Sequence, residues 1–398
     1  MKKQDIGYSV PGFTASAVSA GLKKDGLSDL CLIFSERKAV AAGMFTTNTV
    51  KAAPVLLSQT RIKGGFARAV LANSGCANAC TGERGLKNAL QTTDMVSREL
   101  EIDPDEILVA STGVIGADLP VHRVQRAVPA LVRNLSPDGF QSVAHALMTT
   151  DSFPKVRYFE GTAGGTPFHL LGIAKGAGMI MPNMATMLSI LVSDISIDSQ
   201  TLWPLFRSVT DSTFNRITVD GETSTNDTVL IMANGAAGNS RLDATGIREF
   251  ERGLSCVMGE LSYLIAKDGE GASKVMIIEL LGAATDRDAQ SAARTVSNSY
   301  LVKTAVFGHD PNWGRIMAAL GRSGIMMEEN KVRISINGVT IVEGGLITSL
   351  EREKEAAEQM KNKEITITIH LNQGDCNDRM ITCDLTYDYI KINADYRT

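Results

Sequence analysis

The feature that most constrains this sequence is a run of eighteen residues, Gly176 to Ser193, that carries no charge. A helix that spans a membrane needs about 20 apolar residues, but this run includes two glycines and a Pro-Asn pair, which interrupt helices. Its second half, from Met187 onward, is a continuous apolar run of the kind found in strands buried on both faces. We therefore predict a bend, bordered by the charged Lys175, that leads into a buried strand.

Composition excludes several classes of protein. Charged residues make up 21%, hydrophobic residues 44%, and the net charge is −4. These values exclude an intrinsically disordered chain and argue against a basic nucleic-acid binder. No apolar segment follows the N-terminal Met-Lys-Lys, so we expect no signal peptide and no membrane anchor.

The cysteines point to a reducing compartment. Six cysteines in 398 residues are too few for a disulfide scaffold. Cys76 and Cys80 lie four residues apart, but no second pair with the spacing of metal ligands accompanies them. We expect a cytoplasmic protein with no metal site.

Strand and helix patterns alternate without a regular βαβ rhythm, which favours an α+β class, a layered helix/sheet sandwich. One helix is expected from about Glu83 to Glu101, with Leu86 and Leu90 on its apolar face. The last eighty residues are predicted to be mainly β. They include a hairpin at Asn337-Gly338 and a strand from Met380 to Tyr389.

Thr186 stands at the start of the apolar run, and two interpretations of it are open. It is an ordinary β-branched strand residue, or it is a nucleophile that needs no histidine. If the peptide bond before a threonine is cut, the new α-amine can act as general base for the hydroxyl of the same residue. No phosphate-binding loop, dinucleotide fingerprint, zinc-protease motif or serine-hydrolase elbow is present.

The segment Lys-Gly-Ala-Gly-Met-Ile-Met-Pro-Asn-Met-Ala-Thr-Met-Leu, residues 175–188, closely resembles the self-cleaving signature of the ornithine acetyltransferase family. These enzymes are the glutamate N-acetyltransferases of arginine biosynthesis. Further blocks along the whole chain resemble the family in the same order: residues 41–48, 72–78, 111–116, 149–155, 220–227, 268–274, 310–315 and 392–398.

The resemblance implies a catalytic apparatus built on self-cleavage. Thr186 is the implied nucleophile and Ala185–Thr186 the cleavage point, giving chains 1–185 and 186–398 that stay associated. Thr112 and Gly113 would form the oxyanion hole, although the same residues also suit a plain strand-to-helix turn. A dimer of cleaved protomers is plausible by resemblance.

The resemblance also implies a set of substrate contacts. Lys175 would pair with an α-carboxylate and Glu270 with a side-chain ammonium, both as charge-assisted contacts. The full set of implied contacts is Thr149, Lys175, Thr186, Glu270, Asn393 and Thr398. Asn393 and Thr398 lie at the end of the chain, where the apolar residues before them suggest a tail that is tied down. The block from Asp220 to Asp227 either shapes the floor of the site or forms a turn, and we favour the turn.

The implied reaction is ping-pong transfer of an acetyl group from N2-acetyl-L-ornithine to L-glutamate through an ester on Thr186. It requires no metal or redox cofactor, and acetyl-CoA is an additional candidate donor. An N-terminal-nucleophile amidase or aminopeptidase is the alternative enzyme, with water as the acceptor. A catalytically silent amino-acid binder is the alternative from another class, but the intact signature with Thr186 argues against it.

Overall fold

The structure is a computed structural model that describes residues 8–24, 26–181 and 187–395. The chain divides into two compact units. The described residues of the first lie within Met1–Asn215 and Thr223–Ile265, and those of the second lie within Arg216–Glu222 and Ala266–Arg397. This division differs from the predicted cleavage products, because residues 187–215 and 223–265 fold with the N-terminal half.

The first unit is built on a mixed sheet with the strand order β4-β3-β2-β8-β7-β6-β5, and β1 pairs with β2. Its strands are β1 (Phe13–Val18), β2 (Leu30–Phe45), β3 (Phe66–Asn73), β4 (Ile107–Ser111), β5 (Lys155–Ala163), β6 (Thr166–Lys175), β7 (Leu188–Ser193) and β8 (Thr228–Ala233).

This sheet folds over on itself. The pairing of β2 with β3 changes register between Phe34 and Ala39, so both strands bend there. In a flat sheet β4 and β6 would lie about 24 Å apart, five strand spacings. Instead the Lys175 ammonium at the end of β6 lies 3.4 Å from the hydroxyl of Thr112, next to the end of β4. One hydrophobic cluster contains residues from both halves, such as Leu108 from β4 and Ile190 from β7, and forms the core.

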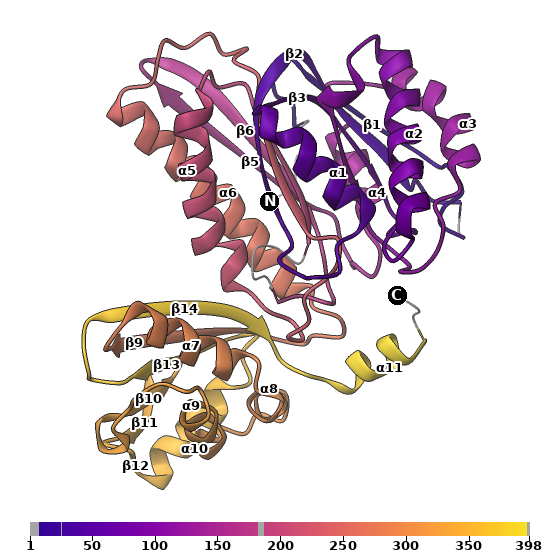
Figure 1. Cartoon of the computed structure of the whole chain (residues 1–398). Coiled ribbons are helices and arrows are strands. Elements are labelled where there is room, and N and C mark those ends of the chain that lie inside the picture. The colour runs from indigo at the N-terminus through magenta and orange to yellow at the C-terminus, as the bar shows by residue number, and fades with distance from the viewer. Residues whose placement is uncertain (1–7, 25, 182–186, 396–398) are drawn as a thin grey trace, which may run out of the picture. The chain divides into compact units, whose positions relative to one another are not determined.

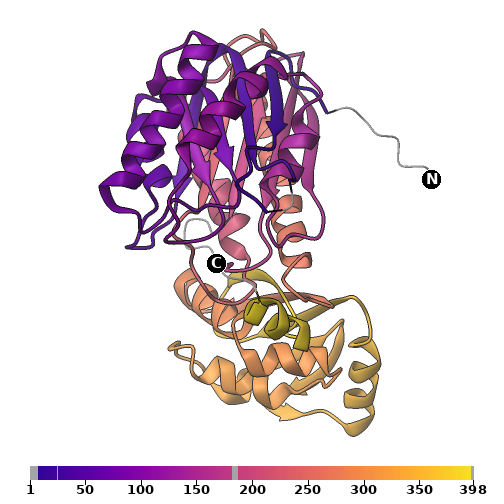
Figure 2. The same cartoon turned by 90° about the vertical axis from the view of Figure 1, so that its right-hand side faces the viewer.

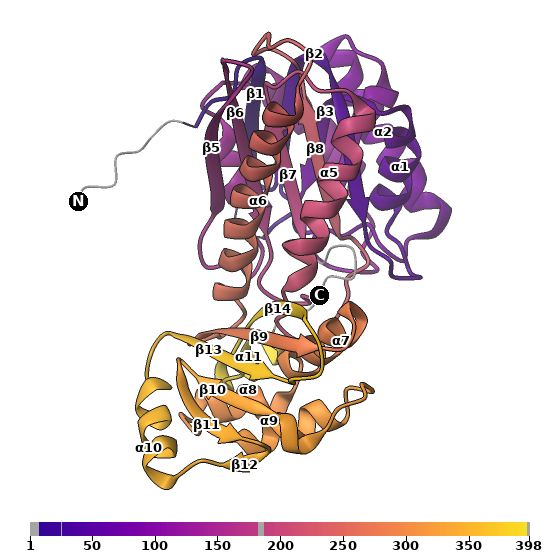
Figure 3. The same ribbon diagram turned by 90° about the vertical axis from the view of Figure 1, so that its left-hand side faces the viewer.

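Helices cover the two outer faces, so the unit is a layered α+β sandwich, as predicted (Figures 1 and 3). These helices are α1 (Ala53–Arg61), α2 (Gly82–Leu100), α3 (Val121–Arg133), α5 (Ser199–Ser212) and α6 (Ala244–Lys267). Helix α4 (Phe140–Leu147) instead contributes its buried residues to the core cluster shared by the two halves. Helices α1, α2 and α3 lie along the half that contains β3 and β4 (Figure 2). Helix α6 lies against β6, where a Cβ on Gly172 would collide with Val257 and Leu261.

The uncharged run becomes the buried strand that the sequence predicts. Every residue of β7 is buried, because the strand pairs on both sides, with β6 and with β8. Among the described residues, no helix is both long and apolar enough to cross a membrane. The predicted bend lies partly in residues 182–186, which are outside the described residues, and Ala185 and Thr186 are among them.

The second unit has its own mixed sheet, with the order β12-β11-β10-β13-β9-β14. Its strands are β9 (Val275–Ala283), β10 (Arg333–Ile336), β11 (Val339–Glu343), β12 (Leu346–Ile347), β13 (Glu364–His370) and β14 (Cys376–Cys383). Its helices are α7 (Asp286–Ser297), α8 (Tyr300–Phe307), α9 (Trp313–Gly321), α10 (Leu350–Gln359) and α11 (Tyr387–Asp395). The predicted hairpin is confirmed: Asn337 and Gly338 both have positive φ between β10 and β11.

The predicted strand from Met380 to Tyr389 is wrong in its second half. Strand β14 ends at Cys383, and the following Asp384 turns its carboxylate to the backbone N–H groups of Ser273 and Lys274. The hydroxyl of Thr386 then accepts the N–H of Asp388, which favours the start of helix α11. None of the residues in α11 is buried, so the tail that the sequence suggests is tied down has only surface contacts in its described part, such as the Tyr387 ring 5.6 Å from the ring of Phe307.

Candidate active site

One edge of the first sheet gathers the segments that the sequence singles out. Lys175 at the end of β6 is opposite Leu188 at the start of β7, and Leu188 is opposite Thr228 at the start of β8. The N–H of Thr228 donates to the carbonyl oxygen of Met187 at 2.9 Å. Met187 is the residue that directly follows the predicted nucleophile in the sequence. This edge of the sheet therefore contains Lys175, which precedes residues 182–186, and Met187, which directly follows them.

The predicted oxyanion turn follows β4 at this same edge. The N–H of Thr112 donates to the carbonyl of Asn73 at 2.9 Å. Gly113 has φ +129°, and a Cβ at that position would overlap the backbone of Gly75. Only glycine fits here, because the conformation is strained for other residues and the neighbouring chain leaves no space.

Lys175 connects two other predicted site residues, Thr149 and Thr112. Its ammonium donates to the hydroxyl of Thr149 at 2.8 Å and lies 3.4 Å from the hydroxyl of Thr112. The Lys175 side chain is 10% exposed. Residues from three distant segments of the sequence therefore converge on one nearly buried ammonium group.

Asp151 balances part of this charge, and the sequence analysis did not assign it. Its carboxylate accepts from Lys155 at 2.7 Å, from the N–H of Gly176 at 2.6 Å and from the N–H of Thr149 at 3.0 Å. Burial alone would raise the pKa of Asp151, but the charges of Lys175 and Lys155 outweigh burial and lower it to about 2. The two lysines and one aspartate carry a net charge of +1.

The only sequence signal for this pair was the block of residues 149–155, which contains both Asp151 and Lys155. A spacing of four residues normally indicates neighbours on a helix. Here residues 151–154 form a loop, and Lys155 begins β5. The spacing of these residues in the sequence therefore could not predict that they form a fully buried ion pair next to Lys175.

Asp227 is a second buried carboxyl group at this edge, and it is 2% exposed. Among the described residues, its Oδ2 atom has no hydrogen-bond partner. Burial raises the pKa of Asp227 well above its usual value, and the opposing effects of Ser224 and of the Lys175 charge are smaller. The block from Asp220 to Asp227 forms bends before β8 and has no helix or strand, as we favoured, but it also packs into the site.

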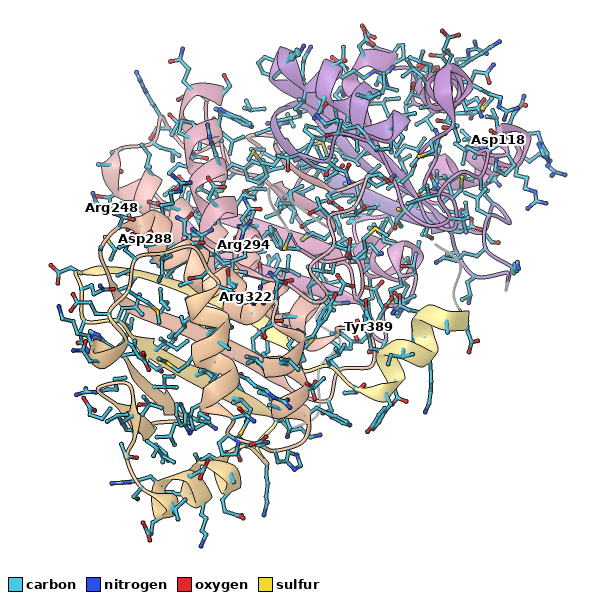
Figure 4. The ribbon with its side chains drawn as sticks, turned by 60° about the horizontal axis from the view of Figure 1, so that its bottom comes forward. Asp118, Arg248, Asp288, Arg294, Arg322 and Tyr389 are labelled. Carbon is cyan, nitrogen blue, oxygen red and sulfur yellow. The ribbon has the colours of Figure 1, made fainter. Side chains whose placement is uncertain are left out.

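The second unit brings together two other predicted substrate contacts. The side-chain amide of Asn393 in α11 donates to Glu270 at 2.8 Å. Tyr389, labelled in Figure 4, lies one turn earlier, and its hydroxyl is 3.3 Å from Asp220 Oδ2. Thr398 lies outside the described residues.

The described residues contain no group of three His, Cys, Asp or Glu side chains that could hold a metal ion. Cys76 is buried, whereas Cys80 is exposed.

Comparison with known proteins gives close matches over the whole length. The model of the ArgJ family matches residues 14–398. The arginine biosynthesis bifunctional protein ArgJ of Geobacter sulfurreducens is 50% identical over 392 residues, which cover 98% of this chain and 100% of that protein. The protein of the same name from Desulfotalea psychrophila is 49% identical over 391 residues, with the same coverage. A solved structure of an ornithine acetyltransferase complexed with ornithine, from Mycobacterium tuberculosis, is 36% identical and covers 47% of this chain and 98% of that one, with a TM-score of 0.40.

Proposed function

Since the chain belongs to the ArgJ family and is an acetyltransferase of arginine biosynthesis, we propose that it acts through an acetyl ester on Thr186. The donor is N2-acetyl-L-ornithine and the acceptor is L-glutamate. The observation that carries the proposal is the meeting of Lys175, Thr149 and Thr112 at the sheet edge next to Met187.

The ammonium of Lys175 suits substrates that carry an α-carboxylate. It lies 3.9 Å from Asp151, whose carboxylate is closer to Lys155 at 2.7 Å, and the Lys175 side chain is 10% exposed. A carboxylate that reaches Lys175 forms a charge-assisted hydrogen bond, which is about twice as strong as a neutral one. Both acetylornithine and glutamate have this carboxylate, so one cation serves both halves of a ping-pong reaction.

Self-cleavage prepares the nucleophile. The Thr186 hydroxyl attacks the carbonyl carbon of Ala185, the C–N bond breaks, and the acyl group moves to oxygen. Water then hydrolyses the ester and leaves Thr186 with a free α-amine. With an unperturbed pKa of about 7.7–8.0, this amine can accept the hydroxyl proton near neutral pH.

Acetyl transfer follows the same path twice. Thr186 Oγ attacks the acetyl carbonyl and passes its proton to the Thr186 α-amine, while Thr112 and Gly113 stabilise the oxyanion. The α-amine then donates this proton to the α-nitrogen of ornithine, which leaves. Glutamate then attacks the acetyl ester and regenerates the hydroxyl. Glu270, oriented by Asn393, provides a carboxylate for the ammonium group at the end of the ornithine side chain.

Further parts of the proposal follow from the resemblance. Thr398 and the Thr186 hydroxyl complete the substrate contacts, acetyl-CoA is an additional candidate donor, and no cofactor is involved. The chains 1–185 and 186–398 stay associated as a dimer of cleaved protomers in the cytoplasm. The fold supports the association, because residues 187–215 and 223–265 lie in the same compact unit as the N-terminal half.

The test combines intact mass with product analysis. Purified protein and the Thr186→Ala variant are compared by mass spectrometry, with N-terminal sequencing of every fragment. We expect two fragments that meet between Ala185 and Thr186 in the wild type and one chain in the variant. The wild type is then incubated with N2-acetyl-L-ornithine, with and without L-glutamate.

The outcomes separate the candidate functions. Formation of N-acetylglutamate only when glutamate is present supports the transferase. Release of acetate at the same rate without glutamate identifies an amidase instead. An uncut wild-type chain that still transfers acetyl groups would contradict the role of the Thr186 amine as base.

A further inference from the structure

Asn226 is buried beneath the oxyanion turn and is 6% exposed. Its side-chain amide donates two hydrogen bonds, to the carbonyl of Ala77 at 2.7 Å and to the carbonyl of Ser111 at 2.9 Å. These acceptors lie 149 and 115 residues away in the sequence. Both N–H groups of one amide are therefore used to join two separate backbone segments.

The two acceptors belong to the segments that enclose Gly113. Ser111 directly precedes Thr112, and Ala77 donates its own N–H to the carbonyl of Val114 at 3.1 Å. Asn226 thus holds one segment just before the turn and the other segment opposite its end. A displacement of either carbonyl moves Thr112 and Gly113 relative to each other.

Other hydrogen bonds fix the orientation of this amide. The hydroxyl of Thr225 donates to Asn226 Oδ1 at 2.6 Å, so the oxygen side of the amide is occupied. The carbonyl of Thr225 accepts the N–H of Ala52 at 3.0 Å, and the Asn226 carbonyl accepts the Thr228 hydroxyl at 2.9 Å. Because carbonyls can only accept, the NH₂ side must face Ala77 and Ser111.

We propose that Asn226 is a positioning residue that holds Thr112 and Gly113 in the geometry required for oxyanion stabilisation. This inference rests on the proposed function of that turn. Asn226 belongs to the chain 186–398, whereas Ala77, Ser111, Thr112 and Gly113 belong to the chain 1–185. After cleavage the second chain therefore keeps the oxyanion hole of the first in register through two hydrogen bonds.

The test uses two substitutions and a matched control. Asn226→Ala removes the amide, and Asn226→Asp keeps its shape without the two N–H donors. Asn239 is the control, because it is also buried and its amide donates to the carbonyls of Ser196 and Ser240 at 3.0 and 2.9 Å. For each variant, thermal unfolding, the rate of fragment formation, and kcat and KM of the cleaved protein for acetyl transfer are measured.

We expect both Asn226 variants to lower kcat about 100-fold, the effect of a displacement near 1 Å, with KM within about threefold of the wild type. Fragment formation slows as well, because its tetrahedral intermediate uses the same turn. Asn239→Ala is expected to lower Tm about as much as the Asn226 substitutions do. Its kcat, in contrast, stays within about threefold of the wild-type value. If the Ala variant does not fold, the Asp variant gives the result.

The proposal is wrong if a folded, cleaved Asn226 variant keeps wild-type kcat, or if Asn239→Ala reduces kcat equally. Thr112→Val is assayed alongside to separate the two proposals. Full activity of Thr112→Val contradicts the oxyanion assignment itself. Loss of activity in Thr112→Val with normal activity in Asn226→Asp contradicts only the positioning role.

Discussion

Asp151 and Asp227 are buried carboxyl groups of the same folding unit, and Lys175 influences both, yet their surroundings have opposite effects. Asp151 accepts hydrogen bonds from a buried lysine and from two backbone N–H groups, so its charged form is stabilised. Asp227 is surrounded mainly by hydroxyl groups and has one oxygen without a partner among the described residues, so its protonated form is favoured.

This difference shows how burial and neighbouring charges act on a carboxyl group in opposite directions. At Asp151 the charges of two lysines outweigh burial, whereas at Asp227 burial outweighs the charge of Lys175. The contrast between the two aspartates can be tested one residue at a time.

The largest effect is expected for Asp151→Asn. The substitution removes the carboxylate that pairs with the buried ammonium of Lys155 at 2.7 Å, and breaking a buried ion pair costs about 3–5 kcal/mol. Urea unfolding at pH 7 measures the loss. The pKa near 2 also means that stability from Asp151 is present above about pH 4 and falls as the pH drops toward 2, by about 2 kcal/mol. If the free energy of unfolding of Asp151→Asn falls by less than about 1 kcal/mol at pH 7, Asp151 is not stabilised in its charged form more strongly than Asp227.

The second prediction adds Lys155→Met to Asp151→Asn. The double variant no longer buries the ammonium at position 155, which is fully buried in the wild type. We expect it to regain at least about 1 kcal/mol relative to Asp151→Asn alone, measured by the same urea unfolding. Equal stability of the single and double variants would show that the cost does not come from the buried charge of Lys155.

The third prediction concerns the pH dependence of Asp227. Its pKa in the folded protein is raised, so the stability it contributes is present below about pH 4 and is lost as the pH rises through the folded-state pKa. Asp227→Asn lacks this titration and should change stability by no more than about 1 kcal/mol at pH 4. Between pH 4 and pH 8 the wild type should lose stability relative to the variant. If the difference in unfolding free energy between the wild type and Asp227→Asn is constant from pH 4 to pH 8, Asp227 stays ionised in the folded protein.

The smallest effect is expected for Asn393→Ala in the second unit, where Glu270 shares an exposed hydrogen bond. Exposed polar contacts of this kind contribute little, so the free energy of unfolding should change by less than about 0.5 kcal/mol. Thermal unfolding provides the measurement, with Asp151→Asn as the contrasting variant. A large loss of stability would show that the end of α11 has a structural role that its exposure does not suggest.

The fold class and several elements could be predicted because they depend on local pattern. The uncharged run predicted β7, and Asn337-Gly338 predicted the hairpin. The helix from about Glu83 is present as α2, but its buried face was wrong. Leu86 and Leu90 are 38% and 39% exposed, and small residues such as Ala89 and Val96 face the core instead. Close packing against the sheet requires small side chains, which hydrophobicity alone does not indicate.

The sequence by itself determined the set of chemical groups and their order, including the signature around Thr186 and the glycine of the oxyanion turn. It also determined the buried strand, because an apolar run without charge has few other stable environments. Only the tertiary structure decided that Lys175 meets Thr112 and Thr149, that the pKa of Asp151 is lowered while that of Asp227 is raised, and that Asn226 joins the segments of Ala77 and Ser111. These properties depend on burial and on contacts between separate segments, such as Lys175 and Thr112, 63 residues apart, or Asn226 and Ala77, 149 residues apart. Local sequence does not encode either of them directly.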